Sequence, residues 1–269
     1  MRLASSPKQG SLTAVGIGIK LAQQCTPEAR REIEAADVVC TGGGDPVTQR
    51  WLSGLNANTL SLQAHYRRGK SRRASYEEMV EAILTPVRAG RRVCAAFYGH
   101  PGVFVYCSHR AIEQARNEGF EARMLPGVSA EDCLFADLGV DPGRGGCQSY
   151  EATDWLINAR AFDTSAPLVL WQIAVVADRS MMQLTSDPRR VAILADVLMR
   201  FYPPEHVVTL YEAAVFATGQ PKIAPIALRD LALAPITQQS TLYIPRLAPP
   251  RADPERLALV AGCLDAPAA

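Results

Sequence analysis

Several common signals are missing from this chain of 269 residues. Its seven cysteines form no Cys-x-x-Cys pair and its four histidines are scattered, so the sequence shows no metal-binding spacing. No stretch approaches the length of a membrane span, and the first ten residues lack the apolar run of a secretion signal. We therefore expect no metal and no membrane partner, and a cytoplasmic protein with reduced thiols.

An excess of charge of either sign is also missing. Lys and Arg number 28 against 27 Asp and Glu, which gives a formal net charge of +1. Proteins that bind nucleic acid usually show a strong basic excess, so we expect no nucleic-acid partner. The 48% of hydrophobic residues is enough for a buried core, in one large domain or in two smaller ones.

Two glycine-rich stretches do not complete the motifs that they begin. Residues 15–18 (VGIG) resemble the start of a dinucleotide-binding loop, but Leu21 stands where the third glycine is needed. Residues 42–46 (GGGDP) lack the Lys and Ser or Thr that close a phosphate loop, and we expect a flexible loop there. The Gly-x-Ser-x-Gly turn of many hydrolases does not occur. A nicotinamide site and a serine nucleophile are therefore disfavoured.

The first part of the chain alternates between strand-like and helix-like segments, as in a parallel sheet with helices between its strands. The expected strands are residues 11–18, 38–41, 92–98 and 122–125. The expected helices start at Thr26, at a capping box formed by Ser75 and Glu78, at Ser108 and at Ser129. The helix behind Ser75 should bend or end near Pro86.

The pattern changes after the turn-rich stretch at residues 141–146, which we take as a domain boundary. Beyond it we expect strands at 168–174, 207–211 and 241–245 and a helix through 191–201. The chain is therefore divided into an N-terminal tail (1–10), an α/β domain (11–140), a second α/β domain (141–250) and a short helical tail (251–269). In that tail we expect an amphipathic helix at 253–264.

Two blocks place glycine and proline where a strand gives way to a helix: residues 98–104 (YGHPGVF) and 126–139 (PGVSAEDCLFADLG). Glycine has no Cβ, so turns of this kind let a ligand contact backbone amides directly. In the second block, Ser129 with Asp132 three residues later is expected to cap the following helix. The two blocks therefore predict a ligand site.

A third segment, residues 66–73 (YRRGKSRR), is basic and leads into Tyr76. It is consistent with a solvated basic loop followed by a residue at the head of an apolar helix face. It is also consistent with phenols and a guanidinium placed around a reacting group, a combination that can remove a proton and stabilise the resulting oxyanion. The segment alone favours the solvated loop over the catalytic arrangement.

With these motifs in place, the span from Gly10 to about Pro250 resembles the tetrapyrrole-methylase-like fold of S-adenosylmethionine-dependent transferases. More narrowly, it looks like the borosin-type peptide backbone α-N-methyltransferases. The closer resemblance rests on residues 10–13 (GSLT), 69–72 (GKSR), 98–104, 124–138 and 150–154 (YEATD). The parent methylases usually have Gly-Asp-Pro where this chain has Gly-His-Pro, and His100 therefore favours a peptide over a tetrapyrrole as the acceptor.

The resemblance implies two α/β domains with S-adenosylmethionine in a cleft between them and S-adenosylhomocysteine as the product. The residues that it implies for cofactor binding are Tyr98, His100, Val103, Phe104, Ser129, Ala130, Gln172, Tyr211, Ala213, Ser240 and Thr241. Backbone donors at a helix start suit the ligand's carboxylate, and apolar walls suit its adenine.

The resemblance also implies that the segment 63–76 is catalytic, through Tyr66, Arg72 and Tyr76, with Tyr98 shared with the cofactor site. An amide nitrogen is a poor nucleophile because its lone pair is delocalised. Our hypothesis is that Tyr76, helped by Tyr66, takes the amide proton while Arg72 holds the oxyanion. A tyrosine has an ordinary pKa of about 10, so Tyr76 can act as a base only if a nearby cation lowers its pKa. Family members often have another tyrosine at the position of Gln63, which leaves the pocket shape open.

The acceptor implied by the resemblance is a separate, ribosomally made precursor peptide that is methylated repeatedly on its backbone amides, as in the split form of the family. A homodimer that forms a heteromeric complex with the peptide is implied as well. Two alternatives stay open: carbon methylation of a tetrapyrrole, which His100 and residues 66–76 disfavour, and a peptide-binding relative without turnover, which Tyr66, Arg72 and Tyr76 disfavour.

Overall fold

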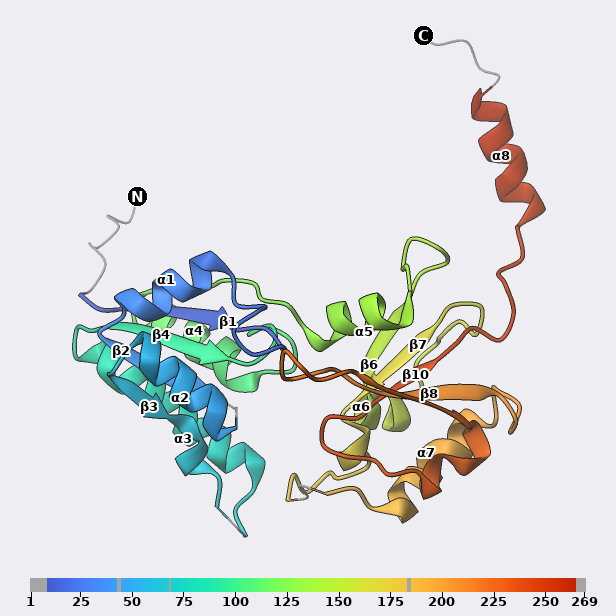
Figure 1. The fold of residues 1–269 in the computed structure, drawn as a ribbon. Helices are drawn as coiled ribbons and strands as arrows, with labels where there is room; N and C mark the ends of the chain where they lie inside the picture. Colours follow the sequence, from blue (N-terminus) through green and yellow to red (C-terminus); the bar gives the residue numbers. More distant parts are fainter. Residues whose placement is uncertain (1–8, 43–44, 68, 183–184, 265–269) are drawn as a thin grey trace. The chain divides into compact units, whose positions relative to one another are not determined.

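The computed structural model describes residues 9–42, 45–67, 69–182 and 185–264 (Figure 1). Its chain divides into two compact units: the first contains the chain up to Val140 with Asp178–Gln183 and Glu212–Lys222, and the second contains the remainder. Each unit has its own sheet flanked by helices, so the predicted α/β fold with two domains is confirmed. Most of the predicted N-terminal tail, the centre of the predicted loop at 42–46 and the last five residues lie outside the described residues.

The first unit is built on a five-stranded parallel sheet. Its strands lie in the order β3-β2-β4-β1-β5. They are β1 (Ser11–Gly16), β2 (Val38–Gly42), β3 (Thr59–Ser61), β4 (Arg92–Phe97) and β5 (Glu121–Met124). Every strand predicted for this part of the chain is present, and β3 was not predicted because it has only three residues.

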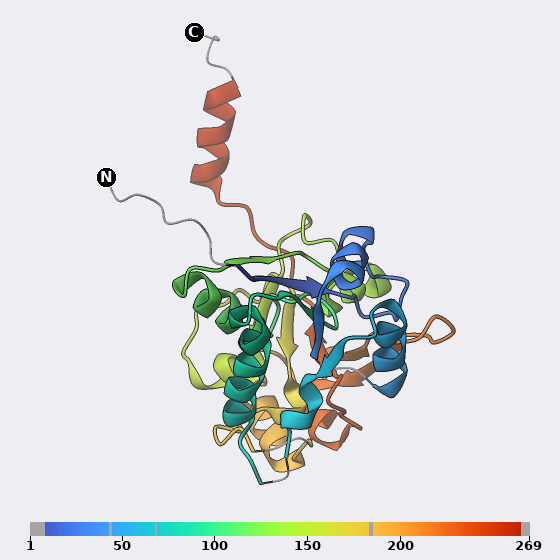
Figure 2. The ribbon, with the colours of Figure 1, turned by 90° about the vertical axis from the view of Figure 1, so that its left-hand side faces the viewer.

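Helices cover both faces of this sheet (Figure 2). The first unit contains α1 (Pro27–Ala35), α2 (Pro46–Leu55), the 3₁₀ turn η1 (Leu62–His65), α3 (Arg72–Arg88), α4 (Tyr106–Asn117) and α5 (Ala130–Leu138). The predicted caps at Thr26 and Ser129 are confirmed, because each side chain accepts a backbone amide of its helix. Helix α2 was not predicted; Asp45 caps it and Pro46 begins it, so only the first part of the GGGDP stretch precedes the helix.

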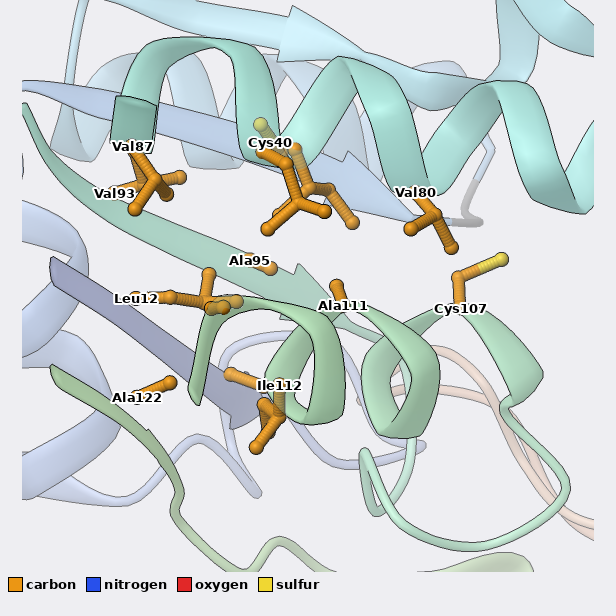
Figure 3. Close-up of a cluster of buried hydrophobic side chains, with 14 of the residues drawn as sticks. Leu12, Cys40, Val80, Val87, Val93, Ala95, Cys107, Ala111, Ile112 and Ala122 are labelled. Carbon is orange, nitrogen blue, oxygen red and sulfur yellow. The ribbon is translucent and has the colours of Figure 1, made fainter. Parts of the chain in front are cut away.

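The side chains of the strands alternate between two apolar cores. In β4, Val93 and Ala95 face α3 and α4, whereas Cys94 and Ala96 face α1 and α2. Figure 3 shows the first core, with Val80 and Val87 of α3 and Ala111 and Ile112 of α4 pointing to the strands. Burial on both faces explains why the central strand β4 is apolar without a break from Val93 to Phe97.

Helix α3 begins earlier than predicted, and the expected capping box at Ser75 and Glu78 is wrong. Ser71 caps the helix instead: its side chain accepts the amide of Ala74 at 3.2 Å. Ser75 is buried inside the first turn and donates to the Ser71 carbonyl oxygen. The helix also continues through Pro86 and ends at Arg88. The earlier start makes Arg72 the first helical residue.

The second unit contains a mixed sheet in the order β6-β7-β10-β8-β9. Its strands are β6 (Gln148–Glu151), β7 (Leu168–Trp171), β8 (Val207–Glu212), β9 (Lys222–Ala227) and β10 (Thr241–Ile244). Its helical segments are α6 (Ala152–Ile157), η2 (Ile173–Val175), α7 (Pro188–Leu198), η3 (Leu228–Leu233) and α8 (Pro254–Leu264). The strand predicted at 168–174 stops at Trp171, because Gln172 has a φ of 59° and a 3₁₀ turn follows.

None of the helices among the described residues is both long and apolar enough to cross a membrane. The longest of them, α3, carries charged residues along its exposed side.

Backbone segments cross closely at the carboxyl edge of the first sheet. A Cβ at Gly16 would lie 2.3 Å from the Gly99 carbonyl oxygen and 2.9 Å from the Gly127 Cα. Both neighbours are backbone atoms, which cannot move aside as a flexible side chain can. This contact therefore requires glycine at residue 16 and fixes the loops that follow β1, β4 and β5 to one another.

Replacing Gly16 with alanine should destabilise the protein by about 1–3 kcal/mol, because the added methyl group overpacks a backbone contact. The free energy of unfolding in denaturant measures the effect. Gly54 is the matched control: it lies in α2 with nothing within 4 Å of an added Cβ. Gly54→Ala should stabilise by ~0.5–1 kcal/mol. Equal unfolding midpoints for Gly16→Ala and wild type would refute this account.

Candidate active site

The carboxyl edge of the first sheet contains the switch point of its topology. After β1 the chain crosses over β4 to form β2, toward one side of the sheet. After β4 it crosses over β1 to form β5, toward the opposite side. The loops after β1 and β4 are tied there by Gly99 N donating to the Gly18 carbonyl oxygen at 2.8 Å. In open α/β sheets, ligands bind at this point because the flanking loops diverge.

Seven of the sequence-predicted cofactor residues belong to the first unit. Four of them follow β4, at Tyr98, His100, Val103 and Phe104, and Ser129 and Ala130 follow β5. The structure therefore brings both predicted blocks to one edge of one sheet. Ala213 lies in the segment Glu212–Lys222, whose Val215 carbonyl oxygen accepts the amide of Leu21 at 2.8 Å.

The loop after β4 presents apolar side chains to solvent. Tyr98 is 59% exposed and Phe104 is 48% exposed. Phe104 also has a φ of 55°, which is unfavourable for a residue with a Cβ. Strained backbone of this kind is concentrated at ligand sites, so it supports a functional interpretation of this loop.

His100 has a defined orientation within the same loop. Its Nδ1 accepts the amide of Gly102 at 2.9 Å, so the proton of the neutral ring is on Nε2. Nε2 is then a donor that can bond a ligand oxygen or a carbonyl group.

The start of α5 is fixed by a reciprocal capping box. Asp132 N donates to Ser129 Oγ at 3.1 Å, and Ser129 N donates to Asp132 Oδ2 at 2.7 Å. Ser129 is buried and Ala130 is the first helical residue. The N-terminal end of a helix favours a negatively charged group, as the carboxylate of an amino acid would supply.

Four predicted cofactor residues belong to the second unit and lie at one edge of its sheet: Gln172, Tyr211, Ser240 and Thr241. Thr241 of β10 pairs with Tyr211 of β8. Leu242 pairs with Leu170 of β7, so the same register continued brings Ser240 opposite Gln172. Residues that are remote in sequence are therefore neighbours in this unit.

The predicted catalytic residues gather in the first unit. Arg72 and Tyr76 are four residues apart on α3, which puts both side chains on one face of the helix. The Tyr66 ring meets the Tyr76 ring edge-on, with 6.2 Å between their centroids. Tyr98 interacts electrostatically with both of these phenols.

The Tyr66 hydroxyl is held in its protonated form. Although 37% of the residue is exposed, burial is the largest cause that raises the pKa of Tyr66, and the neighbouring Tyr76 raises this pKa further. The Tyr66 phenol beside the Tyr76 ring therefore resists ionisation.

Arg72 has an acidic partner that the sequence analysis missed. Its Nη2 lies 3.6 Å from Oδ2 of Asp178, whose side chain is fully buried. The Nε of Arg72 is buried and has no hydrogen-bond acceptor among the residues that the structure describes. A buried N–H without an acceptor costs about 1–3 kcal/mol, and a ligand oxygen would recover that energy.

Tyr106 was also missed. Its ring stacks on Tyr76 with a centroid distance of 6.0 Å, and its hydroxyl donates to Oε1 of Glu77 at 2.6 Å. Tyr76 therefore contacts two aromatic rings, those of Tyr66 and Tyr106. Only the position of Tyr106 two residues after the YGHPGVF block could have suggested this. In the structure it is the first residue of α4.

The interpretation of residues 66–73 as a purely solvated basic loop is too simple. Glu78 of α3 binds Lys70 Nζ at 2.5 Å and His65 Nδ1 at 3.2 Å, and these contacts lower the pKa of Glu78, the Lys70 contact most. The segment that carries Tyr66 is thereby attached to the helix that carries Tyr76. Arg67 and Arg73, in contrast, are exposed.

Across the described part of the chain, no group of three or more His, Cys, Asp or Glu side chains is placed to hold a metal ion. The arrangement instead offers phenols, one partly buried guanidinium and exposed apolar rings.

Comparison with known proteins identifies a family. Residues 11–223 match the model of the tetrapyrrole (corrin/porphyrin) methylases. A methyltransferase and ribosomally synthesized type I borosin cyclic peptide precursor of Coprinopsis marcescibilis is 43% identical over 256 residues, which are 93% of this chain and 65% of the relative. The methyltransferase and omphalotin A precursor of Omphalotus olearius is 43% identical over 91% of this chain and 60% of its own length. The chain therefore spans less than two thirds of these relatives.

Solved structures have the same fold. The cobalt precorrin-4 methyltransferase matches with a TM-score of 0.64 at 17% identity, over 87% of this chain and 94% of that one. The uroporphyrin-III C-methyltransferase of Thermus thermophilus matches with a TM-score of 0.62 at 19% identity, over 89% of this chain and 93% of that one. The latter enzyme has also been solved complexed with S-adenyl homocysteine.

The raised pKa of Tyr66 can be tested by alkaline titration. The pKa of Tyr66 in the folded state lies above the unfolded value of about 10. The contribution of the protonated Tyr66 to stability is therefore complete below about pH 10, and it is lost as the pH rises through the folded-state pKa. Tyrosinate absorbance should therefore be equal in wild type and Tyr66→Phe at about pH 10. Circular dichroism at the same pH establishes that both are folded. A wild-type excess of ~half a tyrosinate there would show that the pKa is not raised.

Proposed function

Because this chain belongs to the tetrapyrrole (corrin/porphyrin) methylase family, we propose that it is a methyltransferase that uses S-adenosylmethionine to methylate backbone amide nitrogens of a ribosomally made peptide. The observation that carries the proposal is the Arg72 Nε, a buried donor without an acceptor among the described residues, one helical turn from Tyr76. Relatives about 40% identical are named as methyltransferases joined to cyclic peptide precursors, which supports a peptide acceptor.

The residues at the two sheet edges suit S-adenosylmethionine. In the first unit, the start of α5 at Ser129 and Ala130 favours its carboxylate, and the exposed side chains of Tyr98, Val103 and Phe104 suit its apolar parts. His100 Nε2 adds a donor. Ala213 and the group formed by Gln172, Tyr211, Ser240 and Thr241 complete the proposed set. When bound, S-adenosylmethionine supplies a methyl group on a positively charged sulfur.

The chemical task of the protein is to make an amide nitrogen nucleophilic. Its lone pair is delocalised into the carbonyl group, so the N–H proton has to leave and the charge has to be stabilised on oxygen. In our mechanism Tyr76 acts as its phenolate, which accepts that proton and becomes a neutral phenol. Tyr66, whose ring meets the Tyr76 ring edge-on, assists in our mechanism by stabilising negative charge on the Tyr76 oxygen with its protonated hydroxyl.

Arg72 stabilises the oxyanion of the deprotonated amide. Its Nε–H is the donor that lacks an acceptor among the described residues, and a charged donor in a partly buried site binds an oxyanion more strongly than it binds a neutral carbonyl oxygen. Because Arg72 binds the oxyanion more strongly than the neutral amide oxygen, it lowers the activation barrier of the reaction rather than only strengthening peptide binding. Tyr98 contributes to both groups, since its phenol lies near Tyr66 and Tyr76.

The source of the acceptor is part of the proposal. The named relatives combine methyltransferase and precursor in one chain, whereas we propose that this protein acts repeatedly on a separate peptide. We further propose that it works as a cytoplasmic homodimer that forms a heteromeric complex with that peptide.

Carbon methylation of a tetrapyrrole is the second candidate, because the family and its solved structures carry that description. The two candidates differ in what they require of Arg72 and Tyr76. An amide acceptor needs removal of its proton and stabilisation of an oxyanion, which these two side chains can provide.

The test is methyl transfer to a candidate precursor, the small peptide that proves to be encoded nearest to this gene, with S-adenosylmethionine as donor. Tandem mass spectrometry should locate methyl-sized increments on backbone amides. Arg72→Ala should lower kcat by about 10²–10³-fold, as for loss of an oxyanion donor, and Tyr76→Phe by about 10²–10⁴-fold, as for loss of a general base. Binding of S-adenosylmethionine, measured by calorimetry, should stay within about twofold.

Arg73→Ala is the matched control, since Arg73 is the next residue of α3 and is exposed. It should retain the wild-type rate. Wild-type rates in both Arg72→Ala and Tyr76→Phe would remove the assigned roles. Transfer to a carbon of uroporphyrinogen III, with no increment on the peptide, would establish the second candidate instead.

A further inference from the structure

The segment Asp178–Met181 folds onto the first turn of α3, although more than a hundred residues separate them in sequence. The Met181 carbonyl oxygen accepts the amide of Arg72 at 2.9 Å. Arg72 is the first residue of α3, and the first amides of a helix have no partner within it. The segment thus completes the helix start at the residue that we assign to the oxyanion.

This segment has an unfavourable backbone conformation. Met181 has a φ of 56° and Ala177, which precedes Asp178, has a φ of 60°. Residues with a Cβ seldom adopt these values, and they persist only where surrounding contacts enforce them. Contacts around Asp178 therefore determine the path of this segment.

Asp178 provides those contacts through both carboxylate oxygens. Its Oδ1 accepts the Ser180 hydroxyl at 2.5 Å and the Ser180 amide at 3.2 Å. Its Oδ2 lies 3.6 Å from Nη2 of Arg72, and its side chain is fully buried. A buried carboxylate needs a cation nearby because water no longer stabilises its charge.

The distance between the Asp178 carboxylate and the Arg72 guanidinium determines which kind of interaction they form. At 3.6 Å the contact is an ion pair rather than a hydrogen bond, so it restrains the guanidinium through charge from the Nη2 side. The Nε of Arg72 has no acceptor within the described residues. The ion pair with Asp178 therefore restrains the Arg72 side chain and leaves its Nε–H available to a ligand.

We propose that Asp178 is a positioning residue, which holds the Arg72 guanidinium so that its Nε–H is directed at the substrate oxygen. This rests on the proposed function of Arg72. An oxyanion donor has to be in place before charge develops, because reorientation during the reaction would itself cost energy. Neutralising Asp178 leaves the cation in place but releases its orientation.

A double-mutant cycle tests the proposal. Asp178→Asn should lower kcat about tenfold in the wild-type background and by less than about twofold in an Arg72→Lys background, because the two residues act through one interaction. Equal losses in both backgrounds would overturn it, since a purely structural role does not depend on Arg72. Glu113→Gln removes an exposed carboxylate, ion-paired with Arg110 at 2.8 Å, and should leave kcat unchanged.

A second measurement does not depend on activity. The Nε proton of Arg72, identified in nitrogen-15 spectra by its absence in Arg72→Lys, should exchange with solvent about tenfold faster in Asp178→Asn. Unchanged exchange would contradict the positioning role even if the rate falls. If Arg72→Lys and Arg72→Ala both leave the rate unchanged, the proposed function of Arg72 fails, while the exchange experiment still decides what Asp178 does.

Loss of folding in Asp178→Asn would be visible as a lower thermal midpoint. In that case Ser180→Ala replaces it, because this change removes the hydroxyl bond to Oδ1 and keeps both charges. We expect about a threefold loss of kcat with Arg72 present and none in Arg72→Lys. A loss of the same size in both backgrounds would again overturn the proposal.

Discussion

The site depends on one constraint: the backbone at Gly16 passes the backbone at Gly99 and Gly127 at a distance that excludes any side chain. Gly16 ends β1, and Gly99 and Gly127 follow the two strands adjacent to it, β4 and β5. Their contact fixes the loops after β1, β4 and β5 as one layer, so the orientations of the Tyr98 loop and of the α5 start are set together. Rigid strands hold that layer from below, which is how α/β folds usually position ligand-binding loops.

Helix α3 connects this layer to the core. One face buries Met79, Ile83 and other apolar side chains against the sheet, and the same helix begins with Arg72 and presents Tyr76 one turn later. The packing that stabilises the domain thereby also sets the position of the proposed catalytic groups. Acidic neighbours then attach other elements to the helix: Glu78 holds the Tyr66 segment, and Glu77 holds Tyr106.

Features that depend on neighbours in sequence could be predicted, and features that depend on distant contacts could not. The caps at Thr26 and Ser129 were predictable because each bonds within three residues. The start of α3 was mispredicted because Ser71 and Ser75 both fit a cap, and only tertiary packing buries the second. The pairing of Arg72 with Asp178 had no local signal at all, since more than a hundred residues, including two strands of each sheet, separate them in sequence. The grouping of Tyr66, Arg72 and Tyr76 came from a family resemblance rather than from spacing.

The buried Nε of Arg72 has a consequence for laboratory evolution of this protein. Because this N–H has no acceptor among the described residues, a substitution that supplies an oxygen to it should increase the stability of the folded state. Screens for heat resistance alone would select such substitutions. They would accumulate where a peptide oxygen is proposed to bind, and the most thermostable variants would be the least active ones.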